Sequence, residues 1–532
     1  MHKRVAISFF SLMVVFGILI LNIFFTGIDS DISKVAQTIN KKSITLDTSR
    51  GMIYDANMQK IVNTNNYNST VCLPLHENTE KVFPYLQDDE KSKFYSDLSN
   101  GKVSILSIDK AFDEDTIKTV TLSKRYADNQ PCVHLIGHLD SEGKGAMGLE
   151  KAYNSYLSQN SGTMKARWSV NALGHIIHGE RIEFVGENYL SATGIQLTID
   201  LNIQKIAESV LIENNVLKGA IVVMDADTAE ILASASVPTF SPNNLAESLN
   251  DENEPFINRA TSAYSVGSIF KPITASVAIE NNIDLIYNCV GSINIGGTVF
   301  SCNNGTAHGV VNMKTAMEKS CNSYFIALGQ QIGSEKLVSL CRDLGFGEKA
   351  ELADNFYLSA GVVPTPNELL SPQALANFSL GQGNLLVSPI QMACAYSVFA
   401  NGGYYRPPTL MKAIIDDDSN AIQKVALPQR CQVLNGSTIE IIDGLLQSVV
   451  ENGNGNKAYS SLVMGHGKTA TAQSGWFDGE REINHTWFCG YFDYNDITYT
   501  VVIFKEDGQS GAVDCAPIFK QISENIIKTK ST

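Results

Sequence analysis

A serine and a lysine lie three positions apart in the short stretch Val266-Gly267-Ser268-Ile269-Phe270-Lys271. On a helix this spacing places both side chains on one face, about one turn apart. A lysine that is held neutral can accept the proton of a neighbouring hydroxyl, which makes the serine oxygen a nucleophile. Ser268 and Lys271 therefore predict covalent acyl-transfer chemistry. The same spacing at Ser99 and Lys102 is interpreted as polar surface.

Two further patterns could complete such a site. Ser320-Cys321-Asn322 offers a hydroxyl that could pass a proton and an amide that could orient the lysine or a substrate carbonyl. Lys468-Thr469-Ala470 lies among small residues in a predicted strand, where an amine and a hydroxyl could bind the carboxylate of a peptide that pairs with the strand. Each pattern alone is weak, because Ser-x-Asn and Lys-Thr-Ala both recur in the chain. Their value depends on the elements that position them.

Composition limits the classes of function. The chain has 532 residues, of which 44% are hydrophobic and 18% charged, so two or three domains with at least one sizeable core are expected. The net charge is −15, and the sequence contains no basic patch with interleaved aromatic residues. These features argue against a partner made of nucleic acid.

An uncharged run extends from Val5 to Phe25. As a helix it would be roughly 31 Å long, about the thickness of a bilayer core. Lys3 and Arg4 precede the run, so the positive-inside rule predicts a cytoplasmic tail of residues 1–4 and a transmembrane anchor of residues 5–26. The remainder is then extracytoplasmic, at the cell membrane. A cleaved signal peptide is the alternative, but the run is long for one and no small-x-small site follows it closely.

The remaining sequence predicts two parts. Residues 27–195 are polar with short apolar runs and are interpreted as an elongated pedestal. Residues 196–532 predict an α/β (α+β) domain, with an antiparallel sheet flanked by helices and assembled from both ends of the domain. Its predicted elements are a helix at Leu201–Asn215, a hairpin at Gly219–Ser236, a helix from Pro272 to Ile283, strands at Met464–Ala472, His485–Tyr491 and Thr498–Phe504, and a helix at Ile518–Ile527.

The ten cysteines form no C-x-x-C pair, which makes a zinc ribbon improbable. Buried free thiols account for most of them. Cys289 and Cys302 bracket a hairpin-like stretch, and a disulfide between them stays open. The histidine pairs His134/His138 and His175/His178 lack a further set of ligands and are interpreted as structural. The sequence thus predicts no metal site.

The three patterns, in this order, resemble the Ser-x-x-Lys, Ser-x-Asn and Lys-Thr-Gly triple of penicillin-binding proteins and serine β-lactamases, a group whose closely related triple is well known. Other motifs along most of the chain are similar to those of class B penicillin-binding proteins. They are Arg50-Gly51-x-Ile53-x-Asp55, Gly145-x-x-Gly148-Leu149-Glu150-x-x-Tyr153, Asn258-Arg259-Ala260, Ser379-Leu380-Gly381-Gln382-Gly383, Asn401-Gly402-Gly403 and Trp487-Phe488-x-Gly490-Tyr491.

The resemblance implies a membrane-anchored D,D-transpeptidase that cross-links peptidoglycan stem peptides, is acylated by β-lactams and needs no metal or organic cofactor. Ser268 would attack the carbonyl of the penultimate D-Ala, Lys271 would act as the base, and Ser320 would relay the proton to the leaving group.

The same resemblance assigns the other site residues. Asn322 would position Lys271 and the substrate, and Lys468 would supply charge near Ser320. Thr469 would help to hold the substrate carboxylate. The backbone N–H groups of Ser268 and Thr471 would form the oxyanion hole.

The chain departs from the family pattern at three places. Ala470 replaces the usual glycine, Asp55 is followed by Ala56-Asn57 where Arg-Asn is usual, and Asn452–Asn456 lacks the usual threonine. Ala470 supports an alternative function: a protein that is acylated but acts as a β-lactam sensor or a scaffold.

A hydrolytic carboxypeptidase or β-lactamase is a third alternative. The pedestal leaves little room for a glycosyltransferase, so a monofunctional enzyme is expected. By family inference, its partner is a polytopic glycan polymerase of the elongation or division type.

Overall fold

The computed structural model describes residues 2–28, 41–171, 173–177 and 179–531. His178 and residues 29–40 of the predicted pedestal lie outside the described residues. Contacts divide the chain into two compact units. The first comprises residues 1–50, 65–125 and 160–191, and the second comprises residues 51–64, 126–159 and 192–532.

The first unit begins with helix α1 (His2–Ile28). Its segment Lys3–Thr26 is long and apolar enough to cross a membrane. This segment contains the run from which the anchor was predicted, so the structure agrees with a helical anchor at this place.

The other described elements of the first unit are two three-stranded sheets, the α-helices α3 and α4, and the 3-10 helix η1. One sheet has the order β1-β6-β7 and the other β4-β3-β5. Their bounds are β1 (Lys41–Ser49), β3 (Asn65–Cys72), β4 (Ser104–Leu106), β5 (Ile117–Lys124), β6 (Gly162–Ser169), β7 (Glu183–Glu187), α3 (Glu77–Val82), η1 (Phe83–Tyr85) and α4 (Asp88–Ser99). The sequence predicted no strands or helices for this part of the chain. Such strands are hard to detect in sequence, because one face is largely exposed and polar.

Three segments of the predicted pedestal fold into the second unit: residues 51–64, 126–159 and 192–195. Strand β2 (Met52–Tyr54) pairs in parallel with β8 (Gly194–Leu197). The Asp55 carboxylate then accepts the backbone N–H of Asn57 and Gln59, and also that of Leu201 at the start of helix α8. The chain thus passes between the units several times, whereas the sequence predicted one linear boundary at 195/196.

The centre of the second unit is a five-stranded antiparallel sheet with the order β10-β9-β23-β22-β21. The strands come from both ends of the predicted domain, and the predicted fold class is confirmed. Their bounds are β9 (Gly219–Asp225), β10 (Ile231–Val237), β21 (Gly465–Asp478), β22 (Arg481–Tyr494) and β23 (Ile497–Glu506). Strand β21 lies at an edge, so its outer backbone groups are free of strand partners within this sheet.

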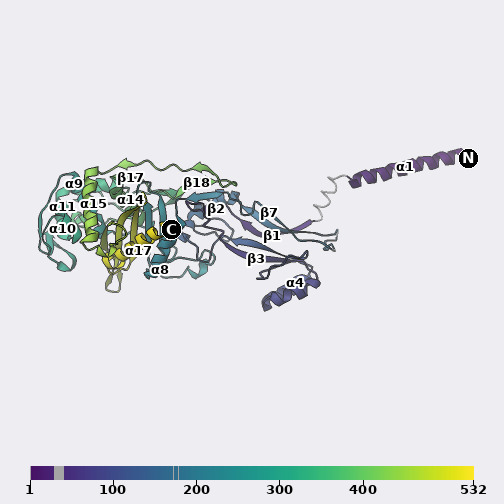
Figure 1. The fold of residues 1–532 in the computed structure, drawn as a ribbon, viewed down its shortest axis with the longest axis horizontal. Coiled ribbons are helices and arrows are strands. Elements are labelled where there is room, and N and C mark those ends of the chain that lie inside the picture. The colour runs from purple at the N-terminus through teal and green to yellow at the C-terminus, as the bar shows by residue number, and fades with distance from the viewer. Residues whose placement is uncertain (1, 29–40, 172, 178, 532) are drawn as a thin grey trace. The chain divides into compact units, whose positions relative to one another are not determined.

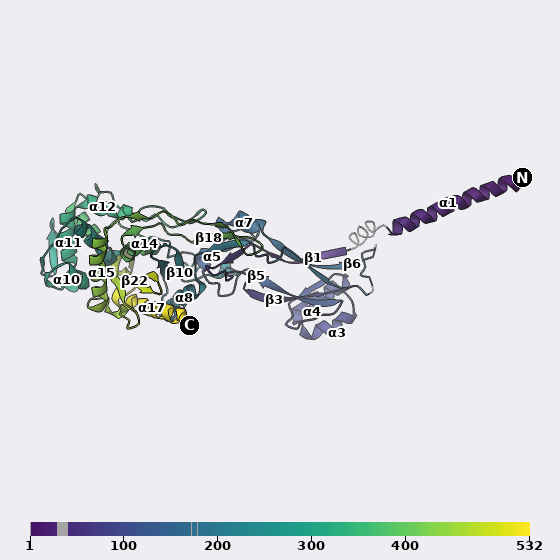
Figure 2. The same ribbon diagram turned by 45° about the horizontal axis from the view of Figure 1, so that its top comes forward.

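Alternation along β9 explains how both faces of the sheet are covered. Val222 packs in the core that contains helix α14, and Val223 packs in the core that contains helices α8 and α17. Helix α15 contacts α9, α10 and strand β21, and α10, α11 and α12 lie together beyond it (Figures 1 and 2). The bounds are α8 (Leu201–Glu213), α9 (Lys271–Glu280), α10 (Met313–Glu318), α11 (Asn322–Ile332), α12 (Ser334–Asp343), α14 (Pro389–Ala400), α15 (Gly436–Glu451) and α17 (Ala516–Lys530).

The remaining elements of the second unit are short. A further sheet has the order β19-β18-β8-β2. The bounds are α5 (Val133–Ile136), α6 (Gly148–Ala152), α7 (Asn154–Gln159), η2 (Leu245–Glu247), η3 (Gly267–Phe270), β11 (Tyr287–Cys289), β12 (Ser292–Ile295), β13 (Thr298–Ser301), η4 (Asn303–Gly305), β14 (Gly309–Val311), β15 (Glu351–Ala353), β16 (Phe356–Tyr357), α13 (Pro372–Ser379), β17 (Tyr404–Tyr405), β18 (Met411–Ile415), β19 (Ala421–Lys424), β20 (Cys431–Gln432), η5 (Asn456–Ala458) and α16 (Gly511–Asp514).

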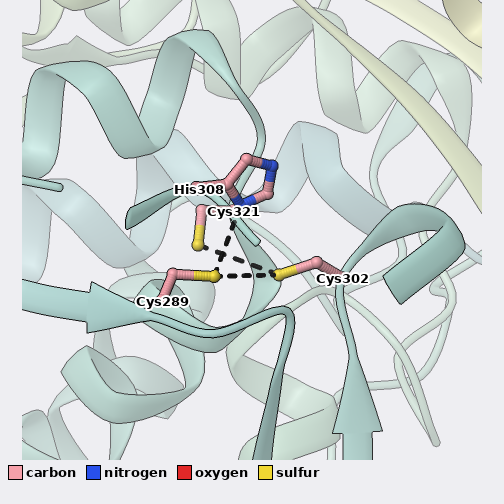
Figure 3. A group of neighbouring side chains, drawn as sticks. All are labelled: Cys289, Cys302, His308 and Cys321. Atoms are coloured by element: carbon pink, nitrogen blue, oxygen red, sulfur yellow. Dashed lines mark hydrogen bonds between the residues drawn. The ribbon is translucent and has the colours of Figure 1, made fainter. Parts of the chain in front are cut away.

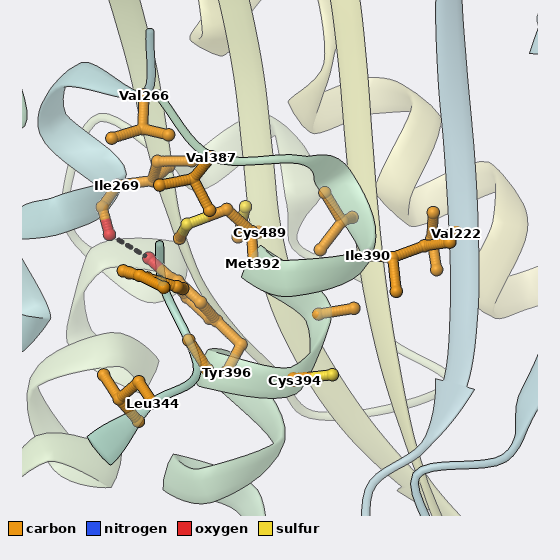
Figure 4. Packing of buried hydrophobic residues seen from close by; sticks show 14 of the residues in the cluster. Val222, Val266, Ile269, Leu344, Val387, Ile390, Met392, Cys394, Tyr396 and Cys489 are labelled. Atoms are coloured by element: carbon orange, nitrogen blue, oxygen red, sulfur yellow. Dashed lines mark hydrogen bonds between the residues drawn. The ribbon is translucent and has the colours of Figure 1, made fainter. Parts of the chain in front are cut away.

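The core between the sheet and α14 also holds the turn that precedes α9. Val266 and Ile269 are fully buried in this core, and the Tyr396 hydroxyl of α14 donates to the Ile269 carbonyl at 2.9 Å (Figure 4). The backbone on both sides of Ser268 is therefore held by packing from the centre of the unit.

A buried ion pair of the second unit lies near the end of β23. Arg259 is fully buried, and its Nε lies 2.8 Å from Oε1 of Glu506, which is 10% exposed. We expect Arg259→Met to lower the free energy of unfolding by about 3–5 kcal/mol, because it leaves the Glu506 carboxylate buried without its cation. Urea denaturation of the full-length protein measures this.

The matched control is Arg481→Met, which removes an exposed pair with Asp507. We expect this change to cost about 0–1 kcal/mol. Equal losses for the two variants would show that the Arg259 pair has no special stabilising role.

Candidate active site

Ser268 lies in the 3-10 turn η3, directly before helix α9. The preceding Gly267 has φ = +60°, and a Cβ at this position would lie 3.0 Å from the Cβ of Ala472 on β21. A side chain here would be strained by the backbone and crowded by the strand. Glycine therefore allows the turn that carries Ser268 to lie directly against β21.

Two motifs quoted for the family resemblance pack around this turn. The Gly267 N–H donates to the Gly381 carbonyl at 2.8 Å. Gly381 has φ = +74°, and a Cβ there would lie only 2.4 Å from the Gly267 oxygen. From the sheet, the Trp487 indole N–H donates to the Ser265 carbonyl at 3.0 Å. These contacts fix the backbone that presents Ser268.

Lys271 is fully buried at the start of α9. Its Nζ donates to the Ser320 carbonyl at 2.8 Å, to Ser320 Oγ at 3.0 Å and to Asn322 Oδ1 at 2.8 Å. Burial lowers the pKa of Lys271 to about 7, because the charged amine has lost its water. Lys271 thus resembles a base poised near neutral pH. Within the described chain it makes no hydrogen bond to Ser268 Oγ, so the two are brought close by the turn alone.

Lys468 approaches Ser320 from the other side. It is fully buried, and its Nζ donates to Ser320 Oγ at 3.1 Å and to the Thr469 carbonyl at 3.0 Å. Burial, together with the nearby charge of Lys271, holds the pKa of Lys468 well below its usual range. Ser320 Oγ therefore joins two buried amines, and a proton can pass between them through this hydroxyl.

The loop that carries Ser320 and Asn322 is conformationally demanding. Ser320 has φ = +53°, a left-handed conformation that is costly for a serine and is found preferentially at functional sites. Asn322 accepts from Lys271 and donates from Nδ2 to the Ser301 carbonyl at 2.9 Å. The amide thus connects the lysine to the β12–β13 hairpin.

The two predicted substrate-binding threonines lie on one face of β21. Thr469 Oγ1 donates to Asn454 Oδ1 at 3.2 Å, and Thr471 Oγ1 accepts the N–H of Gly511 at 3.3 Å. Thr471 is exposed, on a strand with a free edge. The structure therefore gathers Lys271, Ser320, Asn322 and Lys468 into one hydrogen-bonded group, with Ser268 and the two threonines on the adjoining turn and strand.

Residues 219–524 match the family model of the penicillin binding protein transpeptidase domain. The chain belongs to the penicillin-binding protein transpeptidase family. The match covers more than half of the chain and contains every predicted site residue. The predicted relationship to class B penicillin-binding proteins is confirmed by the curated relatives.

The chain is 30% identical to stage V sporulation protein D of Bacillus subtilis over 73% of its length, and 27% identical to penicillin-binding protein PbpB of Mycolicibacterium smegmatis over 76%. It is 26% identical to peptidoglycan D,D-transpeptidase MrdA of Acinetobacter baumannii over 69%. The chain spans 61%, 64% and 58% of these three relatives, less than two thirds of each.

Solved structures support the same fold. The D,D-transpeptidase domain of a peptidoglycan glycosyltransferase from Eggerthella lenta superposes with a TM-score of 0.65 at 22% identity, covering 91% of this chain and 99% of that one. Penicillin binding protein 3 of Mycobacterium tuberculosis, in complex with aztreonam, gives 0.65 at 22% identity, with 91% and 98% covered.

Some residues next to the predicted site residues were not found from sequence. Asn454 contacts Thr469, in the loop where the usual threonine is missing. Cys289, Cys302, His308 and Cys321 form a group next to the Ser320 loop. Cys289 and Cys302 are free thiols with their Sγ atoms 3.7 Å apart, so the disulfide left open above is not formed in this structure. The signal available in the sequence was the pair Cys289 and Cys302 on either side of a hairpin-like stretch, whereas His308 and Cys321 fit no short metal-binding motif.

The structure also shows where the departure at Ala470 lies. Ala470 is 3% exposed and packs in the same core as Trp487, the residue on β22 with which it pairs. Alternation places its methyl on the face of β21 that also carries Lys468. The methyl is therefore accommodated by core packing and does not project from the edge where a peptide would pair.

We expect Ala470→Gly to lower the free energy of unfolding by about 1–2 kcal/mol, through loss of a buried methyl and added chain freedom. The rate of acylation by a penicillin should stay the same or rise, because no site residue loses a hydrogen bond. Urea denaturation and stopped-flow acylation measure the two effects.

Ala233→Gly on β10 is the matched control, since it also removes a fully buried methyl from a strand of this sheet. It should cost similar stability and leave acylation unchanged. A large loss of acylation in Ala470→Gly alone would mean that the site has repacked around the methyl.

Proposed function

We propose that this protein is a peptidoglycan D,D-transpeptidase that works through an acyl-enzyme on Ser268. The observation that carries the proposal is the Lys271–Ser320–Lys468 group, in which one hydroxyl joins two buried amines beside the turn of Ser268. The family membership and the relatives named D,D-transpeptidase support the same activity.

In the proposed acylation step, neutral Lys271 removes the proton of Ser268 as Oγ attacks the carbonyl carbon of the penultimate D-Ala of a stem peptide. The bond from this carbon to the nitrogen of the terminal D-Ala breaks. Ser320 gives its proton to that nitrogen, which leaves as an amine, and the proton held by Lys271 restores Ser320. An ester on Ser268 and a free D-Ala result, with all protons accounted for.

In the second step, an amine of another stem peptide attacks the ester carbon, and the bond from this carbon to Ser268 Oγ breaks. The proton that the amine loses passes through Ser320 and Lys271 to Ser268 Oγ. The substrate carboxylate is held by Thr469 and by the charge of Lys468. The backbone of the substrate peptide pairs with the free edge of β21. The N–H groups of Ser268 and Thr471 stabilise the oxyanion. Removal of one such donor typically slows the reaction about 100- to 1,000-fold. β-Lactams acylate the same serine.

The proposal includes a cellular arrangement. Helix α1 anchors the chain as a single span, with the N-terminus in the cytoplasm and the catalytic unit outside. The enzyme is monofunctional, and a polytopic glycan polymerase of the elongation or division type supplies the glycan strands. If charged substitutions along Val5–Phe25 left co-purification with such a polymerase intact, the anchor would not be the contact.

We expect a penicillin to add its mass to the full-length protein at Ser268, and Ser268→Ala to abolish this adduct. A D-Ala-D-Ala stem peptide or thioester analogue, supplied with an acceptor amine, should then give the aminolysis product. Intact mass, peptide mapping and product analysis measure these events. Labelling at another serine would contradict the site.

The same experiment separates the alternatives. Acylation without transfer would favour the β-lactam sensor or scaffold, and release by water alone would favour a carboxypeptidase or β-lactamase. Thr438→Ala, a buried hydroxyl on α15, serves as a folding control that should still be labelled.

The pKa of Lys271 predicts the pH dependence of acylation. Below about pH 7 the amine is protonated and has no lone pair, so the second-order rate constant should rise about tenfold per pH unit and then level off above that value. Stopped-flow acylation between about pH 5 and 9 measures the profile.

Lys271→Arg is the control, because a guanidinium stays protonated over this range. It should acylate slowly and without the rise. A flat profile for the unchanged protein would contradict Lys271 as the base.

A further inference from the structure

Four potential metal ligands converge beside the catalytic loop (Figure 3). Cys289 ends strand β11, Cys302 follows β13, and His308 precedes β14. Cys321 lies between Ser320 and Asn322. The three thiols are at most 2% exposed, and all four ligand atoms lie within 4.8 Å of one another. Among the described residues, this is the group of three or more His, Cys, Asp or Glu side chains whose ligand atoms lie close enough together to bind one metal ion.

We propose that these residues form a structural zinc site of the Cys₃His type that holds the Ser320–Asn322 loop in its catalytic conformation. Tetrahedral zinc with bonds of about 2.3 Å to sulfur and 2.0–2.1 Å to nitrogen requires S···S edges of about 3.8 Å and S···N edges of about 3.5 Å. The observed Sγ···Sγ distances are 3.7 Å for Cys289–Cys302 and 3.8 Å for Cys302–Cys321, and Cys289 Sγ lies 3.4 Å from Nδ1 of His308. These three edges match those of a zinc tetrahedron, and the other three pairs of ligand atoms lie within 4.8 Å of each other.

Hydrogen-bond donors at the start of α11 face the sulfur atoms of Cys302 and Cys321. Cys302 Sγ receives hydrogen bonds from the hydroxyl, at 3.4 Å, and from the backbone N–H of Ser323. Cys321 receives one from the N–H of Tyr324. Both N–H groups belong to the first turn of α11, where the helix dipole favours negative charge. Donors of this kind fix the ligands and support the metal from the outside.

The segment that supplies three of the ligands is poorly stabilised by packing. Its strands form two separate two-stranded sheets, β11–β14 and β12–β13, of three and four residues per strand. Val290, Val299 and Val310 are each more than 60% exposed. Small hairpins of this kind are marginal in water on their own. A metal that ties both sheets to α11 would provide the missing stabilisation.

The fourth ligand links the metal to the reaction. Cys321 follows Ser320, whose φ of +53° requires an external constraint, and precedes Asn322. The chain is also held from the hairpin, because Asn322 Nδ2 donates to the carbonyl of Ser301, the residue before Cys302. Cys321 lies between Ser320 and Asn322, which accept the hydrogen bonds of Lys271, and Cys302 follows Ser301, to which Asn322 donates. This coupling rests on the proposed function, whereas the metal site does not.

The binding step is balanced without oxidation or reduction. Three thiol protons pass to solvent, three thiolates and the lone pair of neutral His308 Nδ1 bind Zn²⁺, and the centre keeps a net charge of −1. Three thiolates with one imidazole in a closed tetrahedral set are typical of structural zinc.

Metal analysis of the full-length protein, purified reduced in detergent with Zn²⁺ present, tests the site. We expect about one zinc per chain. Cys302→Ser and His308→Gln should each lower this content strongly. Cys431→Ser, which changes an exposed cysteine outside the group, should keep it. Cobalt substitution should give the absorption bands of tetrahedral thiolate coordination and does not depend on activity.

Chelation tests the coupling without any substitution. We expect removal of zinc by a strong chelator to slow acylation of Ser268 by a penicillin at least about tenfold, and Zn²⁺, but not Mg²⁺, to restore the rate. Far-UV circular dichroism distinguishes this effect from global unfolding. Ser268→Ala should retain zinc although it is not acylated, so failure of the proposed function and failure of the zinc site are distinguishable.

Four results would overturn the inference. Absence of zinc and cobalt binding in the reduced protein would exclude the metal site, as would an unreactive Cys289–Cys302 disulfide in the protein as purified. Equal zinc content in Cys302→Ser and Cys431→Ser would place the metal elsewhere. Unchanged acylation after complete chelation would exclude the coupling to the catalytic loop.

Discussion

The chemistry of this protein depends on one constraint: two buried lysines share a single hydroxyl, Ser320 Oγ. In the described chain no carboxylate bonds to either amine, and both have lost their water. Two full positive charges so close together in a medium of low polarity are strongly unfavourable. One amine must therefore be largely neutral near pH 7, and the base that Ser268 needs arises from burial and repulsion. Among the described side chains, Ser320 Oγ bonds to both amines and so gives a direct path for a proton between the two.

The rest of the second unit supports this arrangement. Lys271 lies at the start of a helix and Lys468 on an edge strand, so the start of this helix must pack closely against the sheet. Gly267 permits this approach, and Gly381 supports the turn from behind. The sheet itself combines a hairpin before the site with three strands after it, which explains why the nucleophile, the relay loop and β21 lie far apart in sequence. A rigid sheet therefore holds the site residues in accurate positions.

Much of this could be predicted from the sequence. The hairpin β9–β10 and helices α8 and α17 follow their apolar periodicity, and the residues around Ser320 Oγ belong to motifs with a chemical rationale. Strand β21 continues to Asp478 and strand β22 begins at Arg481, both beyond the predicted ends. The prediction missed these ends because the turn that joins the two strands is polar. Membership of the β2 segment in the second unit depends on pairing with a distant strand, which no local pattern reveals. The same is true of Asn454, whose role comes only from its contact with Thr469.

The group of thiols was missed for a related reason, since its spacing matches no short motif and its geometry exists only after folding. The four ligands come from more of the chain than would be needed to stabilise the hairpin segment alone. Cys289, Cys302 and His308 all belong to the hairpin segment and could close it with a further ligand from the same segment. The fourth ligand comes instead from the loop whose serine joins the two lysines. A metal bound there cannot stabilise the hairpin without also restraining Ser320 and Asn322, so folding of a peripheral segment and order of the proton path become one equilibrium.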